Sequence, residues 1–482
     1  MPPHIVALLA LAAIVAAFIT TIIVRAILFV PYKKDLGKPA LVAVDTEKAV
    51  HDLGEMIKCR TVSHTDRSLD DDAEFDRFEA LLPTLFPAVF EKCKYEKVSD
   101  RALLIKWEGK SHDNPTVLMA HYDVVSVEES KWSKPAFDAV IENGVLWGRG
   151  TLDTKGTLNG ILQAAEQLIS EKFVPERDVY FAFGGDEEVN GHGAPDIVKL
   201  FTERGIAPGI VVDEGGAVVS GAFPGVKENT ALIGIAEKGM VNVEYSVEGI
   251  GGHASSPKPH TPVGILSAAC VKVESHPFKY NLSVAAEKLF DNVCRHSTFL
   301  YRIIFANLWC FAPVLNLIGK LSGGELNAMM RTTTAFTQME GSQGANVIPP
   351  YSRMVSNHRI AEGETPESVV ERITKIVGDD RVKIRALSSF DPSPTSSTEC
   401  EAWDRLSAAV GETWQDAIVS PYYMLACSDS RHWSRVSDKV YRFSAMYLSK
   451  EERATIHGND ERIKFDTVAK TVEFYVRLMK KS

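Results

Sequence analysis

The stretch Val179-Tyr180-Phe181-Ala182-Phe183-Gly184-Gly185-Asp186-Glu187-Glu188 joins an apolar run to two glycines and three consecutive carboxylates. A continuous apolar run is typical of a strand buried on both faces of a parallel sheet. In open α/β folds, the carboxyl edge of such a sheet is where functional side chains collect. Of two adjacent glutamates there, one can hold a metal while the other accepts a proton. A solvated acidic turn explains the same residues, so the neighbouring segments decide between the two readings.

Two other apolar runs end in candidate metal ligands. Residues 116–120 lead directly into His121, and Asp123 follows two positions later. A metal-bound histidine usually donates its other ring N–H to a carboxylate, which gives Asp123 a role beside His121. Residues 209–212 form a short apolar strand that we expect to end at Asp213. Three strands therefore bring imidazole and carboxylate groups, which can bind a metal ion, to one sheet edge.

A glycine-punctuated loop precedes the central acidic turn. Residues 146–156 contain three glycines around Asp153 and lead into a helix expected over 157–170. The glycines allow a sharp turn and close backbone packing around Asp153. Helix capping alone also explains an aspartate at this position.

Near residue 232 the pattern changes to that of a second domain. We expect strands at 238–247, 331–339, 353–360 and 382–388, and helices at 262–273 and 365–377. This β-α-β-β-α-β order predicts a small α+β domain inserted into the larger one. Residues 289–321 are aromatic and apolar, and we interpret them as a helical insertion that packs on the small domain or contacts an apolar ligand or lipid. The polar stretch 388–397 is the expected return hinge.

Composition limits the class of protein. A chain of 482 residues exceeds the size of one hydrophobic core, which predicts two domains. It is 45% hydrophobic and 24% charged, as in globular proteins. The net charge of -10 and the lack of a basic run interleaved with aromatics argue against a nucleic-acid partner. Seven cysteines without CxxC spacing form neither a zinc knuckle nor an evident disulfide framework.

The amino terminus carries a membrane signal. Residues 5–24 contain no charge, and about 20 apolar residues suffice to cross a bilayer. We favour an uncleaved anchor over a signal peptide because the start, Met1-Pro2-Pro3-His4, lacks a basic residue. By the positive-inside rule, the basic residues Arg25, Lys33 and Lys34 argue against placing the rest of the chain in a lumen. The N-glycosylation motif Asn281-Leu282-Ser283 instead supports a secretory compartment. We expect the protein to be membrane-anchored or to enter the secretory pathway, in a vacuole-like or lysosome-like compartment or outside the cell. The sequence leaves open on which side of the membrane the rest of the chain lies.

With these motifs in this order, the chain resembles the zinc exopeptidases that include carboxypeptidase S, glutamate carboxypeptidase and aminoacylase. Residues 147–156, 331–334 and 429–432 are most similar to the branch of carboxypeptidase S and the N-fatty-acyl-amino-acid hydrolases. The resemblance covers residues 44–480. Cys427 departs from the family, in which a small hydroxyl residue is more usual, and this difference bears on substrate detail.

The resemblance implies an α/β fold with three parts. These are a zinc-exopeptidase catalytic domain with a mostly parallel central sheet, an inserted α+β, ferredoxin-like lid or dimerisation domain, and an N-terminal transmembrane or signal helix. The expected boundaries are 1–32 for the signal or anchor, 43–231 and 391–482 for the two parts of the catalytic domain, and 232–390 for the lid with its helical insertion near 285–325.

The resemblance also implies the residues of the site. His121 and Asp213 would hold one zinc ion, Glu188 and His457 the other, and Asp153 would bridge both. Glu187 would be the general base and then the acid, while Asp123 orients His121. His253 would polarise the scissile carbonyl, often from a partner subunit, and Asn346 and Arg359 would contact the substrate carboxylate. Arginine offers the two-donor geometry that a carboxylate prefers, although Arg359 pairing within the lid with Glu367 or Glu371 is the alternative.

The function that follows is hydrolysis of an amide bond next to a free amino-acid carboxylate by water activated on two zinc ions. The enzyme would be a carboxypeptidase or an N-acyl-amino-acid hydrolase. Its partners would be a peptide or N-acyl amino acid as substrate, the membrane through the N-terminal segment, and a second copy in a homodimer. The alternative is an inactive, membrane-anchored binding protein of the same fold, which would need neither Glu187 nor Asp153.

Overall fold

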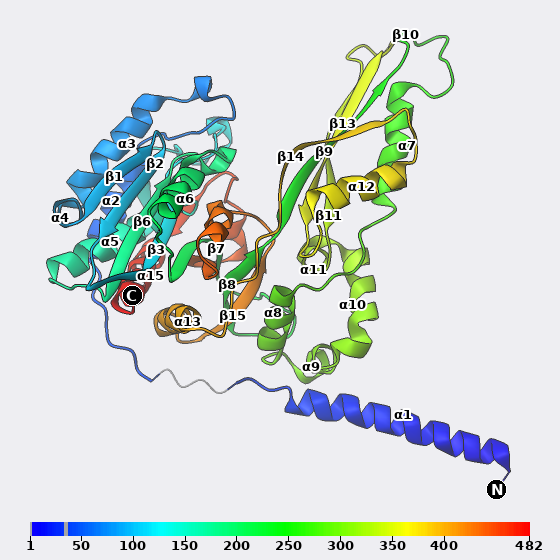
Figure 1. Ribbon diagram of the computed structural model, residues 1–482, viewed down its shortest axis with the longest axis horizontal. Helices are drawn as coiled ribbons and strands as arrows, with labels where there is room; N and C mark the ends of the chain where they lie inside the picture. The colour runs from blue at the N-terminus through cyan, green and yellow to red at the C-terminus, as the bar shows by residue number, and fades with distance from the viewer. Residues whose placement is uncertain (1, 33–36) are drawn as a thin grey trace.

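The computed structural model describes residues 2–32 and 37–482 and separates a larger domain, a smaller domain and a projecting helix (Figure 1). The larger domain is built on an eight-stranded sheet in the order β1-β2-β6-β3-β7-β16-β8-β15. In chain order these strands are β1 (Lys94–Ser99), β2 (Ala102–Trp107), β3 (Ser111–His121), β6 (Arg177–Gly184), β7 (Ile210–Val219), β8 (Asn229–Glu237), β15 (Ala417–Met424) and β16 (Val440–Leu448). The central strands β6, β3, β7 and β16 run parallel, and this confirms the expected α/β sheet.

Both faces of this sheet are covered, which explains the continuous apolar run in β6. Phe181 belongs to the core under α5 (Lys155–Ser170), α2 (Thr46–Ile57) and α15 (Phe465–Lys480). Tyr180 and Ala182 point to the other face, where they join Phe201 of α6 (Gly193–Glu203). Further helices of this domain are α3 (Asp72–Leu85), α4 (Pro87–Lys92), α13 (Glu401–Thr413) and α14 (Lys450–Arg453).

Short elements complete the larger domain. A three-stranded sheet pairs β17 (Arg462–Lys464), β5 (Val145–Trp147) and β4 (Val140–Glu142). The 3-10 turns are η1 (Arg67–Leu69), η2 (Glu129–Lys131), η3 (Glu187–Val189) and η4 (Asp429–Arg435). The turns η3 and η4 carry residues that matter below.

The smaller domain has the expected β-α-β-β-α-β order. Its antiparallel sheet runs β11-β13-β9-β14, from β11 (Thr333–Glu340), β13 (Tyr351–Ile360), β9 (Gly239–Glu248) and β14 (Lys383–Phe390). The helices α7 (Pro262–Glu274) and α12 (Pro366–Val377) pack on it through a core that includes Val241, Tyr245, Leu266 and Ile373. A capping box between Thr365 and Ser368 fixes the start of α12. The two-stranded ribbon of β10 (Gly252–His253) and β12 (Val347–Ile348) forms its tip (Figure 1).

The helical insertion comprises α8 (Val284–Cys294), α9 (Phe299–Phe305), α10 (Leu308–Ser322) and α11 (Gly324–Met329). Its first helix does not pack on the small sheet: Leu289 and Phe290 of α8 share a buried cluster with Phe223 and with Ile418 of β15. The insertion therefore reaches back to the edge strand of the larger domain.

Several local expectations differ from the structure. The boundary placed at residue 232 falls inside β8, and the chain leaves the large sheet only after Glu237. The strand expected to end at Asp213 continues as β7 to Val219, because β16 goes on pairing with it beyond the break at Asp213 and Gly216. The segment 111–115, although rich in residue types that favour turns, forms the start of β3.

The N-terminal apolar segment is the helix α1 (Pro3–Leu28). Its mean hydropathy over the best 18-residue window is 2.8, and none of that window is buried. By length and composition it could cross a membrane or serve as a signal sequence.

Candidate metal centre

The acidic turn lies where β6 ends, and Asp123 holds it in place. The Asp123 carboxylate accepts hydrogen bonds from the backbone N–H groups of Glu187 at 3.2 Å and Glu188 at 3.1 Å. It also accepts one from Ser63 Oγ at 2.6 Å. The turn can start this close to β3 only because position 185 is glycine, since a Cβ there would lie 2.5 Å from the Tyr122 ring. Glu187 and Glu188 are thus presented on a fixed backbone.

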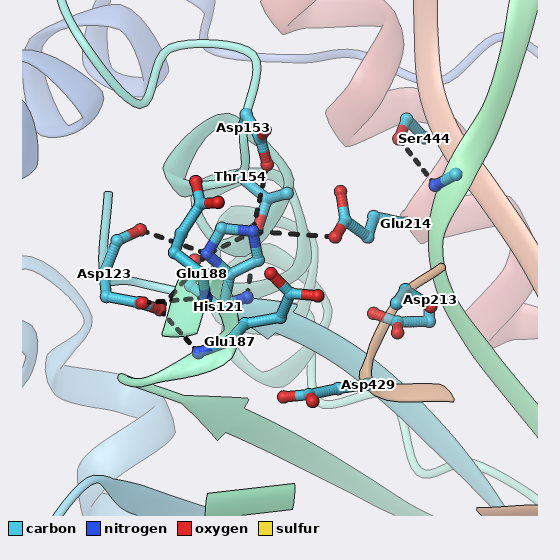
Figure 2. A network of polar contacts seen from close by, with 12 residues as sticks. His121, Asp123, Asp153, Thr154, Glu187, Glu188, Asp213, Glu214, Asp429 and Ser444 are labelled. Atoms are coloured by element: carbon cyan, nitrogen blue, oxygen red, sulfur yellow. Dashed lines mark hydrogen bonds and ion pairs between the residues drawn. The ribbon is translucent and has the colours of Figure 1, made fainter. Parts of the chain in front are cut away.

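His121 ends β3 with its ring aimed into the same site (Figure 2). Its Nδ1 lies 3.0 Å from the Asp123 carbonyl oxygen and 3.3 Å from the Asp123 carboxylate. The Thr154 hydroxyl ties the His121 backbone to the start of α5 through two hydrogen bonds of 2.9 Å. With the Nδ1 proton directed at Asp123, Nε2 is free to act as a metal ligand.

Asp153 lies between two histidines. One of its carboxylate oxygens is 2.9 Å from His121 Nε2, and the other is 3.0 Å from His457 Nε2. His457 Nε2 is also 3.0 Å from the Glu188 carboxylate. A carboxylate whose two oxygens face two separate imidazoles has the position that a residue bridging two metal ions needs.

The loop that carries Asp153 is held by a buried ion pair. Arg149 Nη1 lies 2.6 Å from Glu461, and both side chains are buried. The other Glu461 oxygen accepts hydrogen bonds from the backbone N–H groups of Gly150 at 3.1 Å and Leu152 at 2.7 Å. No sequence motif singled out Glu461, because it lies more than 300 residues from its partners along the chain.

On β7 the structure favours Glu214 rather than Asp213 as the candidate ligand. The Glu214 carboxylate lies 3.6 Å from His121 Nε2 and points toward it in Figure 2. The Asp213 carboxylate instead accepts a hydrogen bond from the Ser430 backbone N–H at 2.9 Å. Asp213 does line a small cavity shared with His121, Glu187 and Asp429. The two neighbours differ in direction because their side chains leave the strand on opposite sides.

Burial and neighbouring groups shift the pKa values of several side chains in the cluster. Burial first, and then neighbouring carboxylates, raises the pKa of Glu214 to about 8. Burial also raises the pKa of Glu187 well above its usual value. Hydrogen bonds to Asp153 and Glu188 raise the pKa of His457 to about 10. Although burial opposes ionisation of Asp153, hydrogen bonds from His121 and His457 lower its pKa.

These side chains fit a centre for divalent cations. Ligand atoms of His121, Asp153 and Glu188 lie within 4.8 Å of one another, and so do those of His121, Glu187 and Glu214. Buried carboxylates packed this densely are stable as anions only when cations balance them. Imidazole with carboxylate is a ligand set that zinc accepts.

The structure does not bring His253 or Asn346 to this cluster. The His253 ring is exposed at the tip of the smaller domain and lies 2.8 Å from Ser255 Oγ. Asn346 lies beside it, since its backbone carbonyl oxygen accepts the Ala254 N–H at 3.0 Å. In Figure 1 this tip, marked by β10, points away from β3 and β7. The two residues are therefore close to each other but distant from the metal ligands of their own chain.

Arg359 lies on β13 and faces the larger domain. Its Nη1 lies 3.3 Å from the sulfur of Cys427, which precedes η4. Within the described residues 2–32 and 37–482, no carboxylate comes within ion-pair distance of Arg359. The expected alternative partner Glu371 is bound to Lys375 at 2.6 Å on the outer face of α12. Asp429, two residues after Cys427, was given no role in the site by the sequence analysis. It is buried in the same region, and burial raises its pKa to about 7.

Comparison with known proteins matches the chain to a family. Residues 117–481 match the family described as "Peptidase family M20/M25/M40". The chain belongs to this peptidase family. It is 35% identical over 413 residues to the "Probable carboxypeptidase S-like 2" of Dictyostelium discoideum, covering 84% of this chain and 79% of that protein. It is 34% identical over 444 residues to the "N-fatty-acyl-amino acid synthase/hydrolase PM20D1" of Xenopus tropicalis, covering 91% and 86%.

Solved structures agree on the fold. The M20 family metallo-carboxypeptidase Sso-CP2 from Sulfolobus solfataricus superimposes with a TM-score of 0.67 at 17% identity, covering 90% of this chain and 98% of that one. Human carnosine dipeptidase 1 gives a TM-score of 0.63 at 13% identity, covering 90% and 96%. The family match and the two relatives confirm the resemblance to this peptidase family, and the chain is an enzyme of a metallopeptidase family.

Proposed function

We propose that this protein cuts an amide bond next to a free amino-acid carboxylate, as a carboxypeptidase or an N-acyl-amino-acid hydrolase. The observation that carries the proposal is the pairing of two features. One is a cluster of histidines and carboxylates, largely buried apart from the exposed His457, with a spare glutamate, Glu187. The other is an arginine, Arg359, whose guanidinium lies near the larger domain with no carboxylate partner among the described residues. The names of the relatives, "Probable carboxypeptidase S-like 2" and "N-fatty-acyl-amino acid synthase/hydrolase PM20D1", support both substrate classes.

Each residue of the cluster has a part in this proposal. His121, Asp153, Glu188, His457 and Glu214 would hold two divalent cations, which we propose are zinc, with Asp153 shared between them. Such ions polarise the carbonyl of the substrate and lower the pKa of water. Asp123 keeps the His121 ring in place and fixes the backbone of the acidic turn.

Glu187 is the proton carrier in this scheme. It is half-buried, its backbone is held by Asp123, and desolvation raises its pKa well above the usual value. As a carboxylate, a group with a raised pKa is a stronger base and takes a proton from the attacking water; as the resulting acid, it returns that proton to the departing amine. This role needs no bond from Glu187 to a cation, which distinguishes it from Glu188.

Arg359 would bind the free carboxylate of the substrate. A guanidinium offers two parallel N–H donors to a carboxylate, and an arginine without an acidic partner leaves them available. Such a contact restricts cleavage to the bond beside the terminal amino acid. We further propose that α1 anchors the protein in a membrane and that the protein acts as a homodimer, since the tip bearing His253 and Asn346 lies away from the cluster of its own chain.

The test uses Glu187→Gln with Glu188→Gln as its matched control. We expect Glu187→Gln to keep both cations while kcat falls by about 10²–10⁴-fold, because the change removes a proton acceptor and no ligand. Glu188→Gln should lose bound metal as well as activity. Metal content measured by elemental analysis separates the two variants. Loss of metal from Glu187→Gln with retention in Glu188→Gln would exchange their roles.

The substrate class is tested on the purified full-length enzyme in detergent. A panel pairs N-acyl amino acids of increasing acyl length with dipeptides that share the same C-terminal amino acid. Cleavage of the first set alone identifies an N-acyl-amino-acid hydrolase, and cleavage of the second alone a carboxypeptidase. No cleavage of any member by the metal-loaded enzyme would favour the alternative of an inactive binding protein.

A further inference from the structure

The helices α8 to α11 connect the two domains and make contacts at both ends. Leu289 and Phe290 of α8 pack into the cluster against Ile418 of β15. At the other end, Arg331 donates hydrogen bonds to Asn316 Oδ1 of α10 at 2.5 Å and to Asn327 Oδ1 of α11 at 2.7 Å. The insertion is thus fixed at both ends, so any surface it presents has a defined position on the enzyme.

The last turns of α1 dock on this insertion. Arg25 donates two hydrogen bonds to the Ala306 carbonyl, at 3.1 and 2.9 Å. Asn307 Nδ2 donates to the Ile22 carbonyl at 3.1 Å. Phe29, just after α1, joins the buried cluster of α8. The helix α1 is therefore held by the junction of α9 and α10 and is not a free tether, although most of its length projects from the body (Figure 1).

Beside this dock, α10 exposes an apolar stripe. Val314, Leu317, Ile318 and Leu321 are spaced as one helical face and are all exposed, Leu321 by 80%. The opposite side carries Leu315 and Gly319, which are buried, and Asn316, which is bound to Arg331. A soluble protein rarely exposes such a continuous apolar face to water unless a partner covers it.

The position of Trp309 connects this stripe to the membrane. Trp309, in the first turn of α10, is 58% exposed and packs edge to face on Phe18 of α1 with 5.8 Å between the ring centres. Phe18 lies six residues inside the uncharged run 5–24, which corresponds to about 9 Å along the helix. A bilayer that covers this run would therefore also surround Trp309. Arg25 and its carbonyl partner then lie near the level of the headgroups.

We propose that α10 lies in the interface of the same bilayer that α1 enters, with the stripe Val314, Leu317, Ile318 and Leu321 turned to the acyl chains. In Figure 1 α10 runs across the direction of α1, as expected for a helix in the membrane plane beside one that crosses it. The enzyme then rests on the lipid surface through two elements, which fixes its orientation. The inference rests on the proposed insertion of α1 and not on the proposed reaction.

Tryptophan quenching tests this placement with the full-length protein in phosphatidylcholine vesicles, with and without bromine on the acyl chains. Trp309→Phe provides the background, to which Leu321→Trp, Leu317→Trp or the control Val174→Trp is added. Val174 is exposed in the turn between α5 and β6 of the larger domain. Brominated lipid should reduce the signal of Trp309 and of tryptophan at 321 and 317 by about twofold, because interfacial helices reach 5–10 Å into the acyl boundary. It should leave the signal at 174 unchanged.

Three results would overturn the proposal. In the first, brominated lipid quenches tryptophan at 321 and 317 no more than tryptophan at 174. In the second, a second copy of the chain covers the stripe, which would be seen as a crosslinked dimer without quenching. Failure of the protein to float with vesicles would also overturn it. The circular dichroism spectrum of each variant, compared with that of the wild type, verifies folding, and a failure of the proposed reaction would leave the quenching result unaffected.

Discussion

Asp213 and Glu214 are neighbours whose side chains meet different partners, and a metal assay separates them. We expect Glu214→Gln to lower bound metal from two equivalents toward one, because it removes the carboxylate that faces His121 at 3.6 Å. Activity should fall with it. Asp213→Asn keeps an oxygen that can accept the Ser430 N–H, so it should retain more metal than Glu214→Gln. The reverse order of metal content would restore Asp213 as the ligand.

Lys238 gives a pH dependence whose sign is fixed by burial. Its ammonium donates to the carbonyls of Ala328 at 3.0 Å and Arg331 at 2.7 Å. Burial, and then the charge of Arg359, lowers the pKa of Lys238 to about 7, whereas an unfolded lysine titrates near 10.4. Between these values the unfolded chain binds more protons, so stability increases with pH, by at most about 1.4 kcal/mol per pH unit.

Lys238→Met should remove this increase. The urea midpoint measured from pH 6 to pH 9 should rise less steeply in Lys238→Met than in the wild type. Lys272→Met is the matched control, because Lys272 is exposed and also donates to a backbone carbonyl, that of Val377. Identical slopes for Lys238→Met and the wild type would show that Lys238 does not titrate as its burial requires.

At the level of residues, sequence reasoning located the site through motifs that end strands. His121, Asp153, Glu187, Glu188 and His457 lie together, since parallel strands and their loops meet at one edge. The choice between Asp213 and Glu214 depends on which side of β7 faces His121, and a break in the pairing with β16 sets that side. Glu461 could not be found, because its role depends only on contacts far apart in sequence.

Among the elements, β13 carries the predicted contact to the substrate. Arg359→Lys should lower kcat/KM about 10- to 150-fold for substrates with a free carboxylate, because an ammonium cannot reproduce two parallel donors and a charge-assisted hydrogen bond is worth about 1.5–3 kcal/mol. Amidated substrates should lose far less. Arg353→Lys on the same strand is the control, since Arg353 is already paired with Glu340 at 2.9 Å. If wild type and Arg359→Lys discriminate equally between free and amidated substrates, Arg359 does not bind the carboxylate.

Elements with strong periodicity were the predictable ones. The helix α12 begins at a capping box with proline in its first turn, and β9 alternates apolar and polar residues. The strands β8, β15 and β16 were not expected. They pair with strands distant in the chain, β8 with β15 and β16 with β7, and their local sequence shows no alternation that a half-exposed strand would have. The end of β7 was misplaced for the same reason.

The arrangement of the whole molecule separates the metal cluster from the lid tip. β10 and β12, which carry His253 and flank Asn346, lie at the far end of the smaller domain in Figure 1. The sequence predicted the two domains and their order but could not give their relative placement, because that depends on contacts between residues far apart in the chain, such as Arg359 with Cys427. A second chain whose lid tip reaches over the cluster would supply the missing histidine.

Mixed dimers test whether His253 acts on the partner's site. One chain carries Glu187→Gln and the other His253→Ala, each with its own affinity tag, and tandem purification isolates dimers that contain both. In a C2 dimer each lid tip serves the opposite subunit, so one of the two sites then combines an intact Glu187 with an intact His253. We expect each parent homodimer to be nearly inactive and the mixed dimer to recover about half of the wild-type rate. If His253 served its own chain, every site would lack one of the two groups and the mixed dimer would stay inactive. Failure to isolate any mixed dimer would contradict the proposed homodimer itself. Neither substitution should change the metal content, so measuring it shows whether the cluster is intact in both chains.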